Sequence, residues 1–150
     1  MNIKIARIDD ADAIRELIIE AATDCKAVDF DDHGWKTFVS ANNIELTKNR
    51  IKNPRYFMLC CWLQNQLVGV ITICDDEKID QLFVKKENRG QGIAKKLWEE
   101  FCRVKSVSGK EYWVRSSTMA VPVYESFGFR VEKSDQILNG IKFTQLVKRA

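Results

Sequence analysis

Histidine is almost absent from this sequence, and the cysteine spacing of metal sites is missing. His33 is the single histidine, and the five cysteines contain no C-x-x-C pair. Structural zinc sites are built from closely spaced Cys and His ligands, and disulfide frameworks use an even set of cysteines in short secreted chains. The sequence therefore predicts neither a metal site nor a disulfide scaffold, and buried, inert thiols are expected at most of the cysteines.

Long apolar runs are also missing. No stretch approaches the ~18 consecutive apolar residues of a membrane-spanning helix. The first ten residues, MNIKIARIDD, alternate like a strand and lack the charged head and apolar core of a secretory signal. We expect no membrane partner and a cytoplasmic location.

Neither sign of charge dominates the sequence. It has 24 basic and 21 acidic residues, with a net charge of +3. Nucleic-acid-binding domains usually carry a basic stripe with interleaved aromatic residues, which this chain lacks, so no nucleic-acid partner is predicted. With 45% hydrophobic and 30% charged residues over 150 positions, the composition is typical of one globular domain, 1–150.

Strand and helix patterns follow one another along the chain. The expected strands are 2–8, 56–63, 67–74, 78–84, 112–116, 129–133 and 141–147. The expected helices are one after Asp10 with apolar positions from Ala13 to Ala21, and others at 44–51, 93–107 and 119–126. Residues 23–43 are the least readable part. This order predicts a mixed α/β sheet with helices on both faces.

The stretch from Leu82 to Phe101 organises the chain, because it passes from a strand through a glycine turn into an amphipathic helix. Glycines at a helix N-terminus leave backbone N–H groups uncovered, and these groups favour an anion such as a pyrophosphate. The third glycine of the dinucleotide fingerprint and the Gly-Lys-Ser/Thr of a P-loop are both absent. Lysines around the turn favour a polyanion. The alternative is a tight turn that binds nothing.

Two motifs resemble the GNAT (Gcn5-related) N-acetyltransferase family. The run Arg89-Gly90-Gln91-Gly92-Ile93-Ala94 resembles the coenzyme A loop of that family, preceded by a similar strand, 79–84. The run 120–129, AVPVYESFGF, is similar to its later helix with a tyrosine. The order of elements also fits over nearly the whole chain. The resemblance implies an α/β fold with a mixed, mostly antiparallel central sheet and helices on both faces.

The resemblance implies acetyl-CoA as co-substrate and no metal. Its pyrophosphate would lie on the N–H groups of the loop, and its pantetheine arm would pair with the free edge of the preceding strand. The residues expected to bind it are Leu82, Phe83, Val84, Arg89, Gly90, Gln91, Gly92, Ile93, Ala94, Lys95, Ser117, Tyr124 and Phe127. Ser117 stands in the region where many members have asparagine, so it offers one fewer donor.

Two residues are candidates for proton transfer. Tyr124 matches the family tyrosine that protonates the departing thiolate; the alternative is an aromatic residue that packs in the core. Asp80, on the strand before the loop, is the first candidate for the base that deprotonates the amine, with Glu77, Asp31, Asp32 and His33 as others. The alternative for Asp80 is a polar residue that faces solvent.

The acceptor is expected to be a small-molecule or peptide amine bound mainly by residues 23–55. An acidic cluster, Asp29, Asp31 and Asp32 with Trp35, hints at a cationic amine, although a solvated loop ahead of a helix is the simpler interpretation. The predicted activity is acetyl transfer to a primary amine by direct attack in a ternary complex. The alternative is a catalytically inactive acyl-CoA-binding regulatory or scaffold module. The hairpin 129–147 is the candidate surface for a homodimer.

Overall fold

A seven-stranded sheet forms the centre of the molecule in the computed structural model, which describes residues 1–105 and 109–149. The strand order is β1-β2-β3-β4-β5-β7-β6, and β4 and β5 form its one parallel pair within the described residues. The strands are β1 Asn2–Ile5, β2 Tyr56–Leu63, β3 Gln66–Cys74, β4 Lys78–Val84, β5 Glu111–Ser116, β6 Arg130–Leu138 and β7 Ile141–Arg149.

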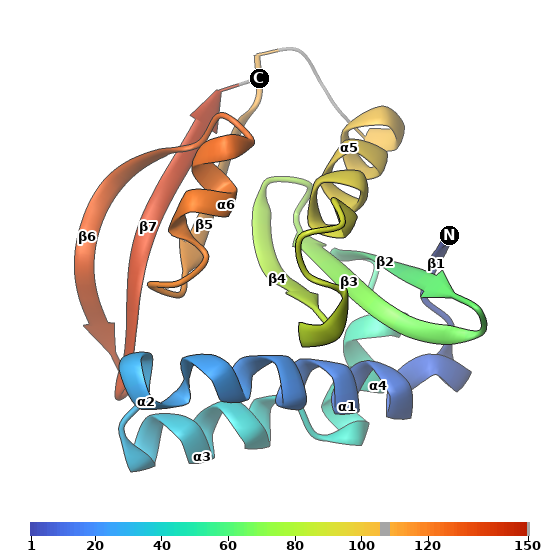
Figure 1. Cartoon of the computed structure of the whole chain (residues 1–150), viewed down its shortest axis with the longest axis horizontal. Helices are drawn as coiled ribbons and strands as arrows, with labels where there is room; N and C mark the ends of the chain where they lie inside the picture. Colours follow the sequence, from blue (N-terminus) through green and yellow to red (C-terminus); the bar gives the residue numbers. More distant parts are fainter. Residues whose placement is uncertain (106–108, 150) are drawn as a thin grey trace.

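The parallel pair separates after a short contact. β4 and β5 are in register only at Lys78 with Trp113 and at Ile79 with Val114. Beyond Ile79, β4 continues along β3 while β5 continues along β7, and the two halves of the sheet diverge (Figure 1). The register between β3 and β4 shifts at this point, which leaves Asp80 as an extra residue. Because such a bulge bends and twists its strand, it helps to open the sheet.

Helices cover both faces of the sheet, as predicted. They are α1 Ala11–Ala22, α2 Lys26–Asp29, α3 Asp32–Ala41, α4 Ile44–Lys52, α5 Ile93–Lys105 and α6 Val121–Ser126, with 3-10 turns at Ile8–Asp10, Thr23–Cys25 and Lys86–Asn88. Alternate residues of β2 serve the two faces: Leu59 and Cys61 pack with the core under α5, and Met58 and Cys60 pack with the core under α1. Both faces of β2 are buried, which explains its continuous apolar sequence.

Most predicted elements are present, with shifts at their ends. The first strand ends at Ile5 because a 3-10 turn begins at Ile8, and β6 extends to Leu138, beyond the expected end at 133, by way of register shifts. The part that was hard to interpret from sequence, 23–43, forms a 3-10 turn followed by α2 and α3, and the helix expected at 44–51 is α4. The expected end of the helix after the glycine turn, at 107, lies outside the described residues.

A buried polar chain joins α3 to the middle of the sheet. The Thr72 hydroxyl lies 3.1 Å from Gln81 Oε1, and Gln81 Nε2 donates to Asn42 Oδ1 at 2.7 Å. Asn42 Nδ2 in turn donates to the Phe38 carbonyl. Buried polar groups are stable when paired in this way, so the chain fixes the end of α3 against β4.

Two further observations concern ligands and membranes. Within 1–105 and 109–149, the structure has no helix with the length and apolarity to span a bilayer. The same residues contain no group of three His, Cys, Asp or Glu side chains arranged to hold a metal ion.

Candidate functional site

The glycine turn before α5 presents free backbone amides. Gly90 and Gly92 both have φ near +79°, a conformation that favours glycine. Helix α5 begins at Ile93, and the Lys96 N–H donates to the Gly92 carbonyl. Among the described residues, no acceptor pairs with the N–H groups from Gly90 to Lys95. These donors, at the positive end of the helix dipole, form a site suited to a phosphate group.

The side chains of Ile93 and Leu97 pack directly on Gly69, and this contact fixes the position of α5 on the sheet. A Cβ atom at Gly69 of β3 would lie 2.7 Å from Ile93 Cγ2 and 3.1 Å from Leu97 Cδ1. Glycine therefore lets the first turns of α5 lie directly on the strand. The glycine turn that precedes α5 is therefore held at a fixed distance from β3 and β4.

The Arg89 side chain ties the turn to the end of α1. Its guanidinium donates to Asp24 Oδ2 at 2.7 Å and to the Ala21 carbonyl at 3.3 Å, while Nε lies 3.4 Å from the Val84 carbonyl. The hydrogen bond from Arg89 lowers the pKa of Asp24, with Lys86 adding a smaller effect. The role of Arg89 in cofactor binding stays a prediction, and the observed contacts show that its side chain holds the loop in place.

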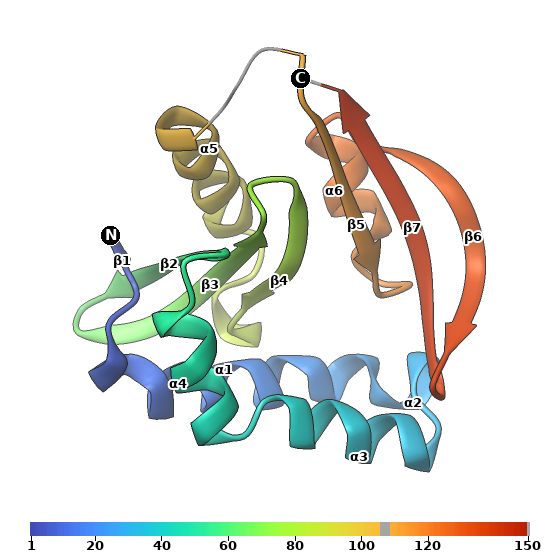
Figure 2. The ribbon, with the colours of Figure 1, turned by 180° about the vertical axis from the view of Figure 1, so that it is seen from behind.

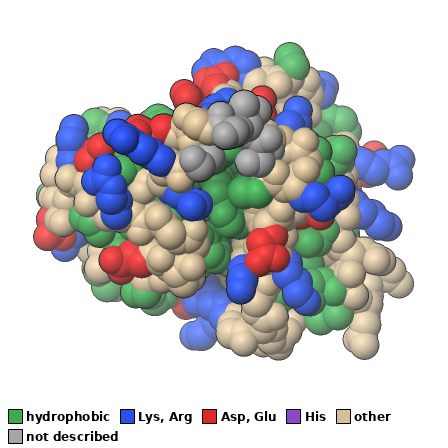
Figure 3. Space-filling view, turned by 90° about the horizontal axis from the view of Figure 1, so that it is seen from above, with side chains coloured by type: hydrophobic (Ala, Val, Ile, Leu, Met, Phe, Trp, Pro, Cys, Tyr) green, Lys and Arg blue, Asp and Glu red, His purple; other side chains and the backbone are tan. Residues whose placement is uncertain are grey.

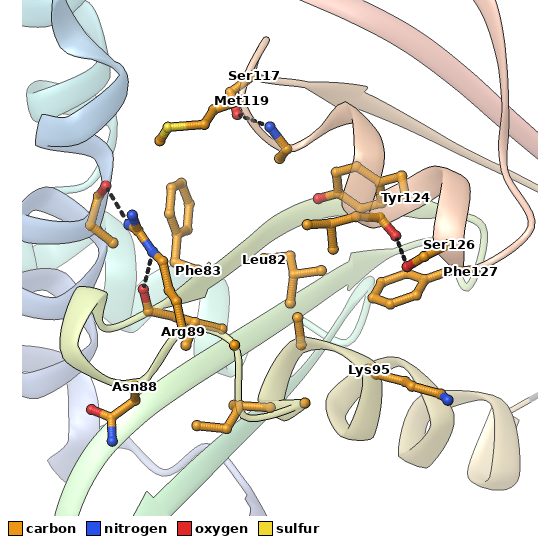
Figure 4. Close-up of a pocket in the computed structure, with 18 of the residues that line it drawn as sticks. Leu82, Phe83, Asn88, Arg89, Lys95, Ser117, Met119, Tyr124, Ser126 and Phe127 are labelled. Atoms are coloured by element: carbon orange, nitrogen blue, oxygen red, sulfur yellow. Dashed lines mark hydrogen bonds between the residues drawn. The ribbon is translucent and has the colours of Figure 1, made fainter.

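A cavity of about 470 Å³ opens beside this turn, between the diverging halves of the sheet (Figure 4). Seen from above, apolar side chains occupy the hollow between the two halves of the molecule (Figure 3). All but one of the residues predicted to bind the cofactor line this cavity; the exception is Gln91. The lining also includes residues that sequence analysis missed: Ala21, Cys25, Asn88, Met119, Ala120, Val123 and Ser126.

One wall of the cavity is the free edge of β4. Leu82, Phe83 and Val84 pair with β3 on one side only, because β5 has already diverged. An unpaired strand edge offers N–H and C=O groups to an extended ligand that contains amides. The Val84 carbonyl is partly used by Arg89. The remaining edge groups lie beside the turn, so one ligand can meet both.

Tyr124 enters the cavity from α6. Its side chain packs among Phe127 and Phe129 and is 5% exposed. Figure 4 shows its hydroxyl pointing away from α6 into the cavity, and no partner for it occurs among the described residues. Burial raises the pKa of Tyr124, because a phenolate is poorly stabilised there. The hydroxyl therefore stays protonated and able to donate.

Ser117 and Cys25 line the same two cavities as Tyr124. The Ser117 Oγ accepts a hydrogen bond from the Ala120 N–H at 3.3 Å, which leaves its own proton free to donate. Burial raises the pKa of Cys25, so this thiol stays neutral near pH 7. Cys25 is therefore expected to be a neutral thiol and a poor nucleophile.

A second cavity, of about 290 Å³, adjoins the first. Residues from α3, α4, β4, β5 and β7 line it, and Figure 2 shows how these elements are arranged. Six residues line both cavities: Cys25, Leu82, Phe83, Ser117, Ala120 and Tyr124. Tyr124 thus stands where two compartments meet through the gap between β4 and β5.

Asp80 lines the second cavity, not the first. Its carboxylate lies 3.9 Å from Arg50 Nε and 3.6 Å from Lys78 Nζ. Its side chain is about a quarter exposed, and this exposed fraction fits a catalytic group and a solvent-facing residue equally well. Its assignment as the base stays a prediction.

The acidic cluster before α3 has structural contacts. Asp29 is buried and accepts bonds from the N–H and hydroxyl of Thr118. The Asp31 carboxylate caps α3 by accepting from the Gly34 N–H at 2.6 Å. These contacts fit the simpler interpretation of the cluster, a loop ahead of a helix. No local sequence pattern predicts the Asp29–Thr118 pair, because 89 positions separate its members.

Comparisons with known proteins agree with this geometry. The family model for the acetyltransferase (GNAT) domain matches residues 25–150. A search of curated proteins found no match.

Solved structures show the same architecture. A GCN5-related N-acetyltransferase from Rhodopseudomonas palustris superposes with a TM-score of 0.82 at 17% identity, over 99% of this chain and 95% of that one. The PaiA N-acetyltransferase from Thermoplasma acidophilum, solved in complex with coenzyme A, gives a TM-score of 0.79 at 21% identity over 100% of both chains. YjaB from Escherichia coli gives 0.70 at 16% identity, over 97% and 95%.

The family match covers more than half of the chain, and the structural neighbours share its fold. The predicted resemblance is confirmed. The chain belongs to the GNAT acetyltransferase family.

Proposed function

We propose that this protein transfers the acetyl group of acetyl-CoA to a primary amine by direct attack in a ternary complex. The observation that carries the proposal is the position of Tyr124, a protonated hydroxyl at the junction of two cavities. One cavity has the free amides and strand edge for the donor, and the other has room for the acceptor.

The main chain would hold the donor. The N–H groups from Gly90 to Lys95 suit its pyrophosphate, and the edge from Leu82 to Val84 suits the two amides of its pantetheine arm. Lys95 lines the same cavity and adds positive charge. An N–H of the β4 edge would stabilise the oxyanion that develops on the thioester carbonyl during attack. Ser117 has a hydroxyl proton to donate to the arm.

The reaction requires proton transfer from the amine and proton transfer to the thiolate. An alkyl amine with a pKa near ~10.4 is almost fully protonated at pH 7, so a base must remove a proton before attack. We assign this step to Asp80, directly or through a water molecule. Attack of the neutral amine gives a tetrahedral intermediate, whose nitrogen then loses its second proton to water. The intermediate collapses with cleavage of the C–S bond, and Tyr124 gives its proton to the departing thiolate. The phenolate is then reprotonated from solvent.

The test combines calorimetry with thiol release. Coenzyme A should bind, and thiol release from acetyl-CoA should exceed hydrolysis when amines from a broad panel are supplied. Binding without amine-dependent release would leave the inactive acyl-CoA-binding regulatory or scaffold module as the function. Absence of coenzyme A binding would overturn both.

A further inference from the structure

Basic side chains surround the second cavity. Arg50 of α4, Arg115 of β5 and Lys142 of β7 line it, against the carboxylates of Asp29 and Asp80. Figure 2 shows the elements that contribute them, with β5 and β7 towards the viewer and α3 and α4 below. Those of these charges that have no partner of opposite sign determine whether the cavity favours an anionic or a cationic acceptor.

Both carboxylates are already engaged. Asp29 accepts two hydrogen bonds from Thr118, and its side chain is buried. Asp80 lies between Arg50 and Lys78, at 3.9 and 3.6 Å. The Asp80 carboxylate thus faces two cations. An acceptor that carried a positive group besides its reacting amine would find no free carboxylate among the residues that line the cavity.

Arg50 has hydrogen-bonding capacity left over. Its side chain is 14% exposed, and its Nη2 donates to the Ala41 carbonyl at 3.0 Å. Nη1 is buried and has no partner among the described residues. Because an unpaired donor on a buried charged group is costly, a small shift of the Arg50 side chain towards an acceptor atom in the cavity that it lines would be favourable.

Arg115 is held without being neutralised. Its guanidinium lies 5.0 Å from the Phe143 ring centroid and 5.6 Å from that of Trp113. No carboxylate lies within ion-pair distance of it in the part of the chain that the structure describes. Aromatic faces fix the position of a cation and leave its N–H groups available to an anion.

We infer that the acceptor amine carries an anionic group, a carboxylate or a phosphate, which Arg50 and Arg115 recognise in the second cavity. This inference rests on the proposed function and names its substrate class. It reverses the expectation of a cationic acceptor drawn from the acidic cluster, since those carboxylates are used by Thr118 and the cap of α3. Anion-bearing amines would be preferred over neutral amines and diamines.

Matched acceptors test the preference. With saturating acetyl-CoA, kcat/KM is measured for 4-aminobutyrate, butylamine and 1,4-diaminobutane, and for O-phosphoethanolamine and ethanolamine. The anionic member of each set should be favoured by about tenfold or more, the effect of one charge-assisted hydrogen bond. The two sets distinguish a carboxylate from a phosphate. Equal rates, or preference for the diamine, would overturn the inference while leaving the acetyltransferase function intact.

Variants locate the recognition. Arg115→Gln should raise KM for the anionic acceptor and reduce its preference over butylamine, with little effect on coenzyme A affinity. Arg50→Gln should reduce the same preference, and because it also removes a cation beside Asp80 it should change the rate with every amine. Arg103→Gln is the matched control, because Arg103 lies on α5, pairs with Glu100 and lines neither cavity. Should Arg50→Gln fail to fold, exposed Arg115 still provides the test. An unchanged preference in Arg115→Gln, with Arg50→Gln either unchanged or unfolded, would contradict the assignment.

Acceptor binding can be measured without turnover, so it tests the recognition of the anionic group separately from the acetyltransferase activity. Coenzyme A-loaded protein should bind 4-aminobutyrate more tightly than butylamine in calorimetry. If no amine is acetylated but this order holds, the proposed activity fails and the recognition stands. If the order is reversed, the recognition fails whatever the activity.

Discussion

Tyr124 satisfies two demands with one side chain. Its ring packs with Phe127 and Phe129 in the core, and its hydroxyl reaches the junction of the two cavities. The two interpretations considered from sequence, a core aromatic and an acid, are therefore compatible. The burial that anchors the ring also keeps the hydroxyl protonated.

The variant Tyr124→Phe should separate these roles. Because phenylalanine keeps the packing and removes the proton donor, kcat should fall by about 10²-fold or more while coenzyme A affinity and melting temperature change little. Stopped assays of kcat, calorimetry and thermal unfolding check the three quantities. An undiminished rate would remove Tyr124 from the proton transfer.

The pH profile follows from the same burial. Since burial raises the pKa of Tyr124 above its ordinary value near ~10, the acid form persists up to about pH 10. We expect kcat to rise with pH as the amine loses its proton, with no decline below about pH 10 from Tyr124. A decline between about pH 8 and 10 in the native protein that is absent from Tyr124→Phe would contradict this.

The sequence predicts the role of some site residues and not of others. The glycine turn and Tyr124 belong to local motifs, and the structure brings them to one cavity. Arg50 and Arg115 carry no local signal, because their role depends on elements that meet only in the folded chain. The same holds for the chain from Thr72 through Gln81 to Asn42, in which Gln81 and Asn42 are 39 positions apart.

At the scale of elements, α5 is fixed from two sides. Gly69 permits its close contact with β3, and Arg89 ties the preceding turn to α1 through Asp24. The amphipathic helix predicted after the glycine turn is α5, and its buried residues are Ile93, Leu97, Trp98 and Phe101. Periodicity predicts which face of a helix is buried, but not the height at which it lies on the sheet.

The substitution Gly69→Ala tests this height. Its Cβ would displace Ile93 and Leu97, so we expect a loss of about 1–3 kcal/mol in unfolding free energy and weaker coenzyme A binding. Chemical denaturation and calorimetry measure the two effects. In an Ile93→Ala background, which removes the nearest clashing methyl group, the added cost should be smaller. Equal costs in both backgrounds would show that the contact does not set the position of α5.

Element boundaries were predicted less well than element types. The strand 78–84 and its partners were expected, yet nothing in the sequence marks Asp80 as the extra residue of a bulge. β6 is exposed throughout, so it lacks the alternating pattern that would reveal its length. Boundaries of this kind depend on pairing with another strand.

For the whole molecule, the donor would lie between two half-sheets that share only two residue pairs across β4 and β5. A ligand that contacts β4, α5 and α6 together binds the folded chain and not the unfolded one. Such a ligand stabilises the fold by mass action.

Coenzyme A should therefore raise the melting temperature. At 100 times its dissociation constant the stabilisation is about 2.7 kcal/mol. In a chain of this size each kcal/mol corresponds to roughly 2–4 °C. Differential scanning fluorimetry measures the shift, and adenosine 3′-phosphate 5′-diphosphate, which keeps the pyrophosphate and lacks the pantetheine arm, should give a smaller one. An equal shift from both would show that the β4 edge takes no part.

The early parting of β4 from β5 has an evolutionary consequence. The main-chain N–H and C=O groups along the gap are the same for every residue type, except that proline has no N–H. Side chains at these positions can therefore change without loss of donor binding. Acceptor preference, by contrast, depends on individual charged side chains around the neighbouring compartment. Specificity in this scaffold can therefore drift quickly while its capacity to hold an acyl carrier endures.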